Sequence, residues 1–404
     1  MKKFAPALFL LFVFGLNLYA GDPTERFRLP FRVINNLIVV KAMVNTSGDR
    51  NFILDSGVSA SLIFEMEKGD SLNMKMTRPI VINGMGEGRP INATVSFGNT
   101  LQMGKLTFEN HALVKLEEQL TGLSERMGVR IHGVLSLGLL SPRYVYINYD
   151  RSYLEIWNPD AFRLRRRHRR MATMPFEMIR GKPFVRIKGY YTDSASRDLK
   201  MLIDTGASHS AWLTPSGQEH LIPGPRTDTL LLGAGLSGKV MGYMTRIQKF
   251  EIARYSLRDP LIAFPTKESY SGNYKYLSRD GSLGSEFFRR FHVLFDFVNM
   301  KLYLKPNRQF KDEFRFNASG FEVLMPIMNL PYYVVGKVSK GSPAENVGLQ
   351  EGDHLLQANG RNLFHMEFGE VIKLIEHAHG SKLRLVVSRN GSKHKFVFRI
   401  EGGL

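Results

Sequence analysis

The feature that most constrains the fold of this chain is an internal repeat. Residues 51–61 read NFILDSGVSAS, and residues 200–210 read KMLIDTGASHS. The repeat sets Asp55 opposite Asp204, 149 residues later. Self-similarity at a fixed offset indicates repeated structural units. The middle of the chain is therefore expected to form two homologous lobes.

Further landmarks keep the same register. Gly86 and Gly235 each lie 31 residues after the corresponding aspartate, in Gly-rich stretches that read as hairpin tips. The elements GVLSLG (133–138) and GSLG (281–284) follow, and each precedes a pair of aromatic-rich strands, at 144–157 and 293–304. Short β-branched and aromatic segments between Gly, Asn and Pro turns predict mainly β lobes.

The repeated motif ends an apolar strand in Asp-Ser/Thr-Gly, which places a carboxylate at a tight turn. Gly57 and Gly206 allow close approaches that a Cβ would block. The hydroxyls of Ser56 and Thr205 are expected to fix the carboxylate planes, by hydrogen bonds within the turn or to the opposite lobe. These four residues are predicted to support the aspartates.

Two such turns facing each other would bring Asp55 and Asp204 together. Carboxylates that close cannot both ionise easily, so the pair shares a proton, and one member acts as base and the other as acid. Such a pair can activate a water against a peptide carbonyl without a metal or a covalent intermediate. No metal or cofactor is predicted. Asp150, Asp280 and Asp296 lie outside the repeated motif and are predicted to be structural.

On these motifs, both copies resemble the lobes of the pepsin and retropepsin superfamily of aspartic proteases. Residues 202–208 fit its signature closely, and Leu137-Gly138 and Leu283-Gly284 fit its later apolar-Gly element; the resemblance covers about residues 30–310. It implies a mainly β, bilobal acid protease fold in which Asp55 and Asp204 are catalytic. It also implies that the hairpins of Gly86 and Gly235 close over substrate as flaps.

The first copy departs from the family pattern at Ser56 and Val58, which loosens the match. A flap tyrosine has no clear counterpart near Gly86, and Tyr243 is a loose candidate beyond Gly235. His209 falls opposite Ala60 in the repeat, so it is interpreted as incidental.

The sequence changes character from Gly320 onward. The series GSPA (341–344), GL (348–349), GD (352–353) and NG (359–360) resembles a PDZ domain of the kind attached to bacterial envelope proteases. Ser342-Pro343 with Glu345 reads as a capped helix start. The resemblance implies that an extended peptide, often a C-terminus, adds to the strand that starts at Gly320, Phe321, Glu322 and Val323, beside a helix at 368–378. The alternative is a PDZ-shaped spacer with an empty groove.

The N-terminus has the order of a secretory signal: basic residues, an apolar run over 4–18, and small residues at a cleavage site predicted after Ala20. Export to the periplasm or the extracellular space follows, and a signal left uncleaved would act as a membrane anchor. The chain has no Cys, which excludes disulfides and thiolate chemistry.

Lys and Arg outnumber Asp and Glu by 55 to 37, and the densest basic run is Arg163–Arg170. An exported protein meets little nucleic acid, and no aromatic-basic motif is present. The run therefore has two readings: a solvated linker, or a contact with an anionic envelope surface.

Together these features predict a signal peptide at 1–20, an N-terminal lobe at 21–160, a basic linker at 161–176, a C-terminal lobe at 177–312 and an α+β PDZ domain at 318–404. The predicted function is an aspartic endopeptidase that cleaves peptide or protein substrates of the envelope, with the PDZ domain binding peptide ends. The alternative is a non-catalytic peptide-binding scaffold, whose binding would survive loss of the aspartates.

Overall fold

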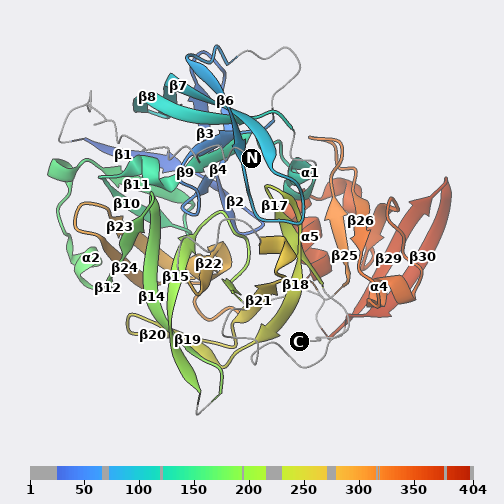
Figure 1. The fold of residues 1–404 in the computed structure, drawn as a ribbon. Coiled ribbons are helices and arrows are strands. Elements are labelled where there is room, and N and C mark those ends of the chain that lie inside the picture. Colours follow the sequence, from blue (N-terminus) through green and yellow to red (C-terminus); the bar gives the residue numbers. More distant parts are fainter. Residues whose placement is uncertain are drawn as a thin grey trace, which may run out of the picture.

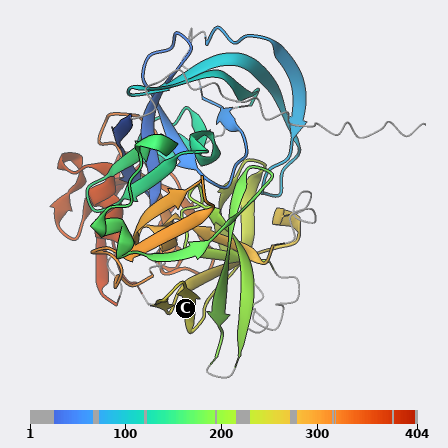
Figure 2. The same cartoon turned by 90° about the vertical axis from the view of Figure 1, so that its left-hand side faces the viewer.

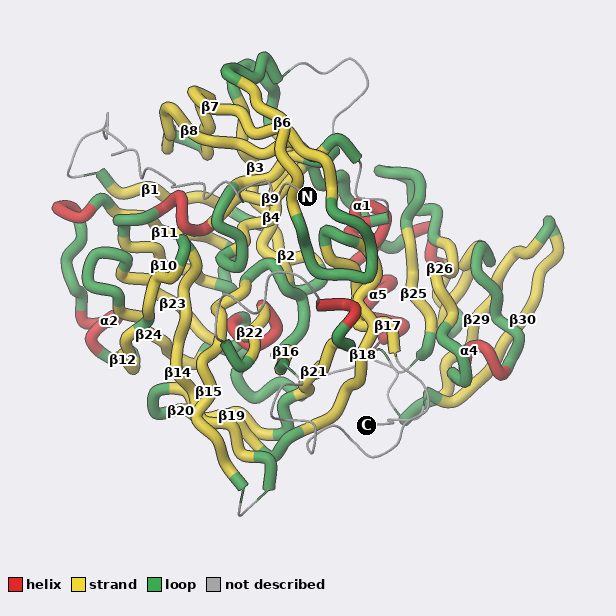
Figure 3. Tube along the Cα trace, in the orientation of Figure 1, coloured by secondary structure: helices red, strands yellow, loops and turns green. Residues whose placement is uncertain are grey.

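The computed structural model describes residues 25–65, 72–118, 122–192, 195–214, 230–270, 279–314, 317, 319–376 and 380–400. Strands dominate, and the helices between them are short (Figure 3). Two β lobes are followed by a C-terminal domain, drawn in orange and red (Figure 1). The signal sequence predicted at 1–20 lies outside the described residues. Among the residues described, no helix is long and apolar enough to cross a membrane.

The first lobe is an eight-stranded sheet. In order across the sheet, its strands are β2 (Arg32–Ile34), β3 (Leu37–Val44), β4 (Arg50–Asp55), β9 (Gly133–Ser136), β5 (Ser61–Ile63), β8 (Leu106–Leu116), β7 (Ile91–Met103) and β6 (Thr77–Ile82). The apolar residues of β4 are buried, and β4 runs parallel to β9. Asp55 therefore ends a strand at the centre of the sheet.

The second lobe repeats this arrangement around β15. Its strands, in order, are β17 (Leu230–Gly235), β18 (Gly238–Arg246), β21 (Leu261–Pro265), β16 (Ala211–Leu213), β22 (Gly281–Gly284), β15 (Ser196–Asp204), β14 (Lys182–Tyr190), β19 (Lys249–Ile252) and β20 (Tyr255–Arg258), with β13 (Glu177–Ile179) paired to β14. β15 runs parallel to β22, as β4 does to β9. Asp204 ends its strand as Asp55 does.

The strand registers correct one sequence assignment. Asp55 lies opposite Ser136, and Asp204 lies opposite Gly284. The counterpart of Leu283-Gly284 is therefore Leu135-Ser136, and not Leu137-Gly138, which begins the 3-10 helix η1 (Leu137–Leu140). In the first lobe, the apolar residue followed by Gly occurs at Leu137-Gly138, two residues after the true counterpart. By then the strand β9 has already ended, at Ser136.

A third sheet joins the lobes. Its order is β1 (Arg26–Pro30), β11 (Tyr153–Trp157), β10 (Tyr144–Asn148), β23 (Phe291–Asp296), β24 (Lys301–Pro306) and β12 (Ala172–Pro175). The two predicted aromatic strand pairs are β10 with β11 and β23 with β24, and β10 pairs directly with β23. The lobes therefore share one sheet, seen from a second side in Figure 2.

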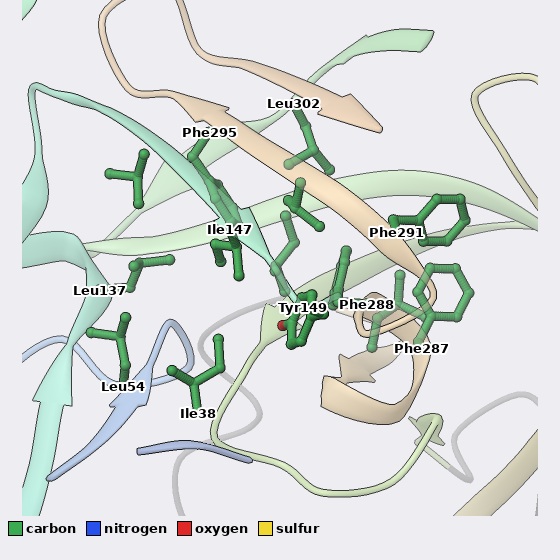
Figure 4. Packing of buried hydrophobic residues seen from close by; sticks show 14 of the residues in the cluster. Ile38, Leu54, Leu137, Ile147, Tyr149, Phe287, Phe288, Phe291, Phe295 and Leu302 are labelled. Atoms are coloured by element: carbon green, nitrogen blue, oxygen red, sulfur yellow. The ribbon is translucent and has the colours of Figure 1, made fainter. Parts of the chain in front are cut away.

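One large hydrophobic cluster runs through both lobes and the shared sheet, with smaller clusters beside it in the first lobe and the shared sheet. Figure 4 shows Leu54, the residue before Asp55, in the same cluster as Ile147, Phe295 and Leu302. Leu54 and Phe295 are fully buried. The strand that carries Asp55 is thus fixed by packing that involves both halves of the chain.

The remaining elements of this part are the helices α1 (Leu123–Met127), α2 (Arg166–Arg169) and α3 (Ser285–Phe288) and the 3-10 helices η2 (Pro159–Ala161) and η4 (Glu268–Tyr270). α2 contains the centre of the basic run. His168 is buried and stacks on Phe162, and Arg167 pairs with Glu155 of β11. The other side chains of the run are exposed.

The C-terminal domain has its own sheet and core. The strand order is β25 (Phe321–Leu324), β26 (Val334–Val338), β27 (His354–Ala358), β29 (Lys382–Arg389) and β30 (Ser392–Arg399), with β28 (Arg361–Asn362) paired to β27. Its helices are α4 (Pro343–Asn346), η6 (Leu363–His365) and α5 (Phe368–Glu376). The Ser342 hydroxyl accepts a hydrogen bond from the Glu345 N–H, as the capping motif predicts. Residues 377–378 of the predicted helix lie outside the described residues.

Candidate active site

Two carboxyl side chains meet where the central strands of the two lobes end. Asp55 follows the buried residues 52–54 of β4, and Asp204 follows the buried residues 201–203 of β15. Their carboxyl groups share a hydrogen bond, and Asp55 is only 8% exposed. The structure thus brings together the two aspartates that the repeat singles out.

Ser56 and Thr205 join the two turns by a reciprocal set of hydrogen bonds. The Ser56 hydroxyl donates to the Ile203 carbonyl over 2.7 Å and accepts from the Thr205 N–H over 3.0 Å. The Thr205 hydroxyl donates to the Leu54 carbonyl over 2.9 Å and accepts from the Ser56 N–H over 3.0 Å. Both hydroxyl side chains are buried. Of the two arrangements expected from the sequence, the structure has the bonds to the opposite lobe.

Gly57 and Gly206 leave room for the carboxyl group of the opposite lobe. A Cβ at Gly57 would lie 2.5 Å from Oδ1 of Asp204, and a Cβ at Gly206 would lie 2.1 Å from Cγ of Asp55. The Gly57 N–H also donates to Oδ1 of Asp55 over 2.6 Å. Any side chain at these positions would push the two carboxyl groups apart.

Burial and mutual repulsion disfavour ionisation of both carboxyl groups. Burial, and then the charge of Asp204, raise the pKa of Asp55 to about 8. Burial also raises the pKa of Asp204, against the opposing effects of Arg279 and Lys182. The hydrogen bond between the two groups favours a protonated Asp55 and an ionised Asp204. Burial and repulsion therefore favour a pair that retains a shared proton over one in which both carboxyl groups are ionised.

The hairpins of the two lobes contact each other through backbone hydrogen bonds. Gly86 lies in the loop between β6 and β7, and Gly235 lies next to the turn between β17 and β18. The Gly88 N–H donates to the Ser237 carbonyl over 2.6 Å, and the Ser237 N–H donates to the Met85 carbonyl over 2.9 Å. The two hairpins are seen side by side in Figures 1 and 2.

Further bonds strengthen the contact between the hairpins. The Glu87 N–H donates to the Lys239 carbonyl, and the Glu87 side chain accepts from the Ser269 hydroxyl over 2.9 Å. A Cβ at Gly235 would lie 2.2 Å from the Met85 carbonyl oxygen. Met85 also lines a pocket together with Trp212 and Arg279 of the second lobe. The loop of the first-lobe hairpin thus lines the same pocket as Arg279, whose charge acts on Asp204.

The residues treated as incidental or structural have structural partners. His209 is buried and stacks on Trp212 at 4.3 Å, and burial lowers its pKa to about 3. Tyr243 lies within β18, opposite Phe264, and not at the hairpin tip. The side chain of Asp150 pairs with His292. That of Asp280 accepts a hydrogen bond from the Lys200 N–H, and that of Asp296 accepts from the N–H groups of Val298 and Asn299.

Two cations near the pair carry no motif and were not predicted. Lys182, the first residue of β14, acts electrostatically on both Asp55 and Asp204. Arg279, two residues before β22, acts on Asp204. Only a comparison of the two lobes could have revealed them, because the corresponding residues of the first lobe are apolar.

The residues predicted to bind peptide in the C-terminal domain lie at the start of β25. Phe321 and Val323 are buried and pair with β26. The Gly320 carbonyl accepts from the Ser339 N–H, and Gly320 has a φ of 81°, which suits glycine. Glu322 points to the first lobe, where it pairs with Arg126 over 3.6 Å.

Helix α1 of the first lobe contacts both walls of the expected peptide groove. The Met325 N–H, just past β25, donates to the Glu125 carbonyl over 3.0 Å. A Cβ at Gly128, the residue that caps α1, would lie 2.3 Å from Cδ1 of Phe368, the first residue of α5. Figure 1 shows α1 beside β25 and α5. The C-terminal domain thus docks on the first lobe through these walls.

Within the part of the chain that the structure describes, no group of three or more His, Asp or Glu side chains is placed to hold a metal ion.

Comparisons with known proteins give two family matches and one structural likeness. Residues 185–287, which contain Asp204, match the aspartyl protease family, and residues 334–389 match the PDZ domain family. An aspartic proteinase from Irpex lacteus is similar in structure at 11% identity, over 71% of this chain and 99% of that one, with a TM-score of 0.45. The chain is thus mainly β and has two paired lobes, the second of which matches the aspartyl protease family, followed by a domain that matches the PDZ family.

Proposed function

We propose that the protein is an aspartic endopeptidase in which Asp55 and Asp204 are the catalytic pair. The observation that supports this most directly is the buried, hydrogen-bonded pair of carboxyl groups, held by reciprocal bonds between the lobes. Burying two carboxyl groups side by side at the ends of apolar strands lowers the stability of the folded protein, because burial and mutual repulsion disfavour their ionised forms. That arrangement makes sense as a device for proton transfer.

The proposed reaction is hydrolysis of a peptide bond. The ionised carboxylate removes a proton from a water molecule, and the water oxygen attacks the carbonyl carbon of the substrate. The protonated carboxyl gives its proton to the carbonyl oxygen, which yields a tetrahedral diol. The carboxyl that gained the water proton then transfers it to the leaving nitrogen, while the other takes back a proton as the carbonyl reforms. The pair ends as it began, with one proton.

The pH dependence follows from this proton count. A pair with no proton lacks its acid, and a pair with two protons lacks its base. Because burial and Asp204 raise the pKa of Asp55 to about 8, activity should fall as the pH rises through about 8. At the acid end, activity should fall when the second carboxyl also becomes protonated. The enzyme should therefore work from mildly acidic to neutral pH.

The hairpins of Gly86 and Gly235 are proposed to act as paired flaps. Their backbone contact would have to open for a chain to enter, and an extended segment fits between the lobes more readily than folded structure.

Exported or envelope proteins in extended states are the proposed substrates, because the N-terminal sequence has the pattern of a secretory signal. The PDZ domain is proposed to bind peptide ends at Gly320–Val323, which requires α1 to move away from the groove walls that it contacts. The exposed side chains of the basic run are proposed to face an anionic envelope surface.

The test compares cleavage of a denatured protein mixture by the mature chain and by the variants Asp55→Asn and Asp204→Asn, from pH 4 to 9. Each variant should lose activity by about 10³-fold or more, the upper range for a group that transfers protons. Asp198→Asn is the matched control, because Asp198 lies exposed on the same strand as Asp204. Binding of substrate without cleavage by the wild-type protein would instead support a peptide-binding scaffold.

A further inference from the structure

The two lobes present equivalent turns to each other's aspartate. In the first lobe, the turn between β2 and β3 sets Ile34 opposite Leu37, and in the second, the turn between β13 and β14 sets Ile179 opposite Lys182. The following strands keep the same register, since β3 pairs with β4 as β14 pairs with β15. Lys182 therefore occupies the position that Leu37 occupies in the other lobe.

Each of these turns lies against the Asp-Ser/Thr-Gly loop of the opposite lobe. The side chain of Asn36 donates to the Ser208 carbonyl over 2.9 Å. On the other side, a Cβ at Gly181 would lie 3.4 Å from Cβ of Ser59, and a Cβ at Gly138 would lie 3.2 Å from the Gly181 carbonyl oxygen. Lys182, the next residue, is thus held at the loop that carries Asp55.

The equivalent positions differ in chemistry. Leu37 is buried, at 6% exposure, among apolar residues. Lys182 is half-buried, and its charge acts on both Asp55 and Asp204. Among the described residues, the charged groups that act on Lys182 are Arg279, Asp204 and Asp55, so two acidic and two basic side chains interact at this place.

Arg279 has the same kind of asymmetry. It precedes Gly281 of β22 by two residues, as Ile131 precedes Gly133 of β9, and β22 and β9 hold the same register against the aspartate strands. Ile131 is fully buried. Both cations beside the pair therefore come from the second lobe.

We propose that Lys182 is a positioning residue for the Asp55/Asp204 pair, whose ammonium group sets the pH window in which the pair holds one proton. The proposal rests on the proposed function, because that window matters only to an enzyme that uses the pair. The turn between β13 and β14 fixes where the charge lies, and among the described residues the second lobe supplies it.

The direction of the effect is fixed by electrostatics. A cation beside two carboxyl groups stabilises their ionised forms, so it lowers the pKa of both ionisation steps. Removing the cation should raise both steps, and both limbs of the pH profile should move to higher pH. An opposite charge within about 4–6 Å shifts a carboxyl pKa by about 1–3 units. With Arg279 still in place, a shift of about one pH unit is expected.

The experiment measures kcat/KM against pH at constant ionic strength for the wild type, Lys182→Met, Lys182→Arg and Lys188→Met. Lys182→Met keeps the length of the side chain but removes the charge, and its limbs should lie about one pH unit higher. Lys182→Arg should restore the wild-type limbs. Lys188→Met is the matched control, because Lys188 is exposed on the same strand and removes the same charge; its limbs should not move.

Unchanged limbs in a folded Lys182→Met protein would overturn the proposal, as would equal shifts in Lys182→Met and Lys188→Met. Lys182→Gln replaces Lys182→Met if the latter does not fold. If the wild type proves inactive, the carboxyl ¹³C signals of Asp55 and Asp204, assigned with the Asp→Asn variants, are titrated instead. A rise of the pair's pKa values in Lys182→Met would then support the electrostatic role while the proposed function fails.

Discussion

The two lobes share a backbone arrangement but differ in what they place beside the aspartates. In both, a central strand ends in Asp, a parallel neighbour covers it, and a turn of two residues touches the other lobe. Where the first lobe has Leu37 and Ile131, the second has Lys182 and Arg279. The comparison teaches that the strand framework fixes where the carboxyl groups lie, whereas side chains outside the motif adjust their charge.

The first lobe differs in another way, because the PDZ domain packs against its helix α1. The contacts of Glu125, Arg126 and Gly128 with that domain all come from α1 and its cap. α1 leads within a few residues to β9, the strand beside Asp55. The segment before Arg279 in the second lobe lies outside the described residues. The second lobe thus provides the cations beside the aspartates, and the first lobe provides the described contacts with the PDZ domain.

Apart from the aspartates themselves, the largest effect is expected at the glycines that face the carboxyl groups. Gly57→Ala and Gly206→Ala should each lower kcat/KM by about 10²-fold or more, because a displacement of about 1 Å at a reacting group has effects of that size. The cause is a Cβ placed 2.1–2.5 Å from the carboxyl atoms of the opposite lobe. Gly48→Ala is the control, since a Cβ there meets no atom within 4 Å. Full activity in one variant alone would show that the lobes do not share this requirement.

An intermediate effect is expected at the reciprocal hydroxyl groups. Ser56→Ala and Thr205→Ala each leave one buried carbonyl and one buried N–H of the opposite lobe without a partner. Each variant should therefore reduce the free energy of unfolding by about 2 kcal/mol, measured by urea denaturation. Thr205→Ser retains the hydroxyl and should lose much less. A large difference between the Ser56 and Thr205 variants would mean that the lobes do not contribute equally.

The smallest effect is expected at the contact between α1 of the first lobe and the PDZ domain. Gly128→Ala should loosen the docking of the PDZ domain, because its Cβ would lie 2.3 Å from the Phe368 ring. Hydrogen exchange at the Met325 amide should become faster, while kcat/KM changes less than about twofold, since a ring can move aside. Gly122→Ala is the control: it has a similar positive φ, at the other end of α1, but faces only the end of the Arg126 side chain. Equal exchange in both variants would mean that the PDZ contact has no part in the effect.

The sequence predicted the elements of the site that recur in the chain. Asp55, Asp204, Ser56 and Thr205 could be identified because a repeated motif encodes a local turn, and the structure brings their turns together. The later element was misplaced at Leu137-Gly138 because an apolar residue followed by Gly also occurs just past the strand. The strand register against β4, which decides the matter, is a long-range property that local pattern does not contain.

The cations and the domain contacts could not be predicted in the same way. Lys182 is one of 55 basic residues in the chain, and it lies 127 residues from Asp55 in sequence. The hydrogen bonds between the hairpins and those between α1 and the PDZ domain join segments that share no motif. Such contacts depend on how folded units pack, and a single sequence shows no signal for them.

The pairing of β10 with β23 has a consequence for how the protein behaves on dilution. Each aspartate of the proposed catalytic pair comes from a different lobe, yet both lobes are covalently joined and share one sheet. If two separate copies of one lobe had to associate, they would dissociate at low protein concentration and the site would be lost. Here the partner lobe is present at a fixed effective concentration. Specific activity should therefore be independent of protein concentration, and a single molecule should be able to act alone.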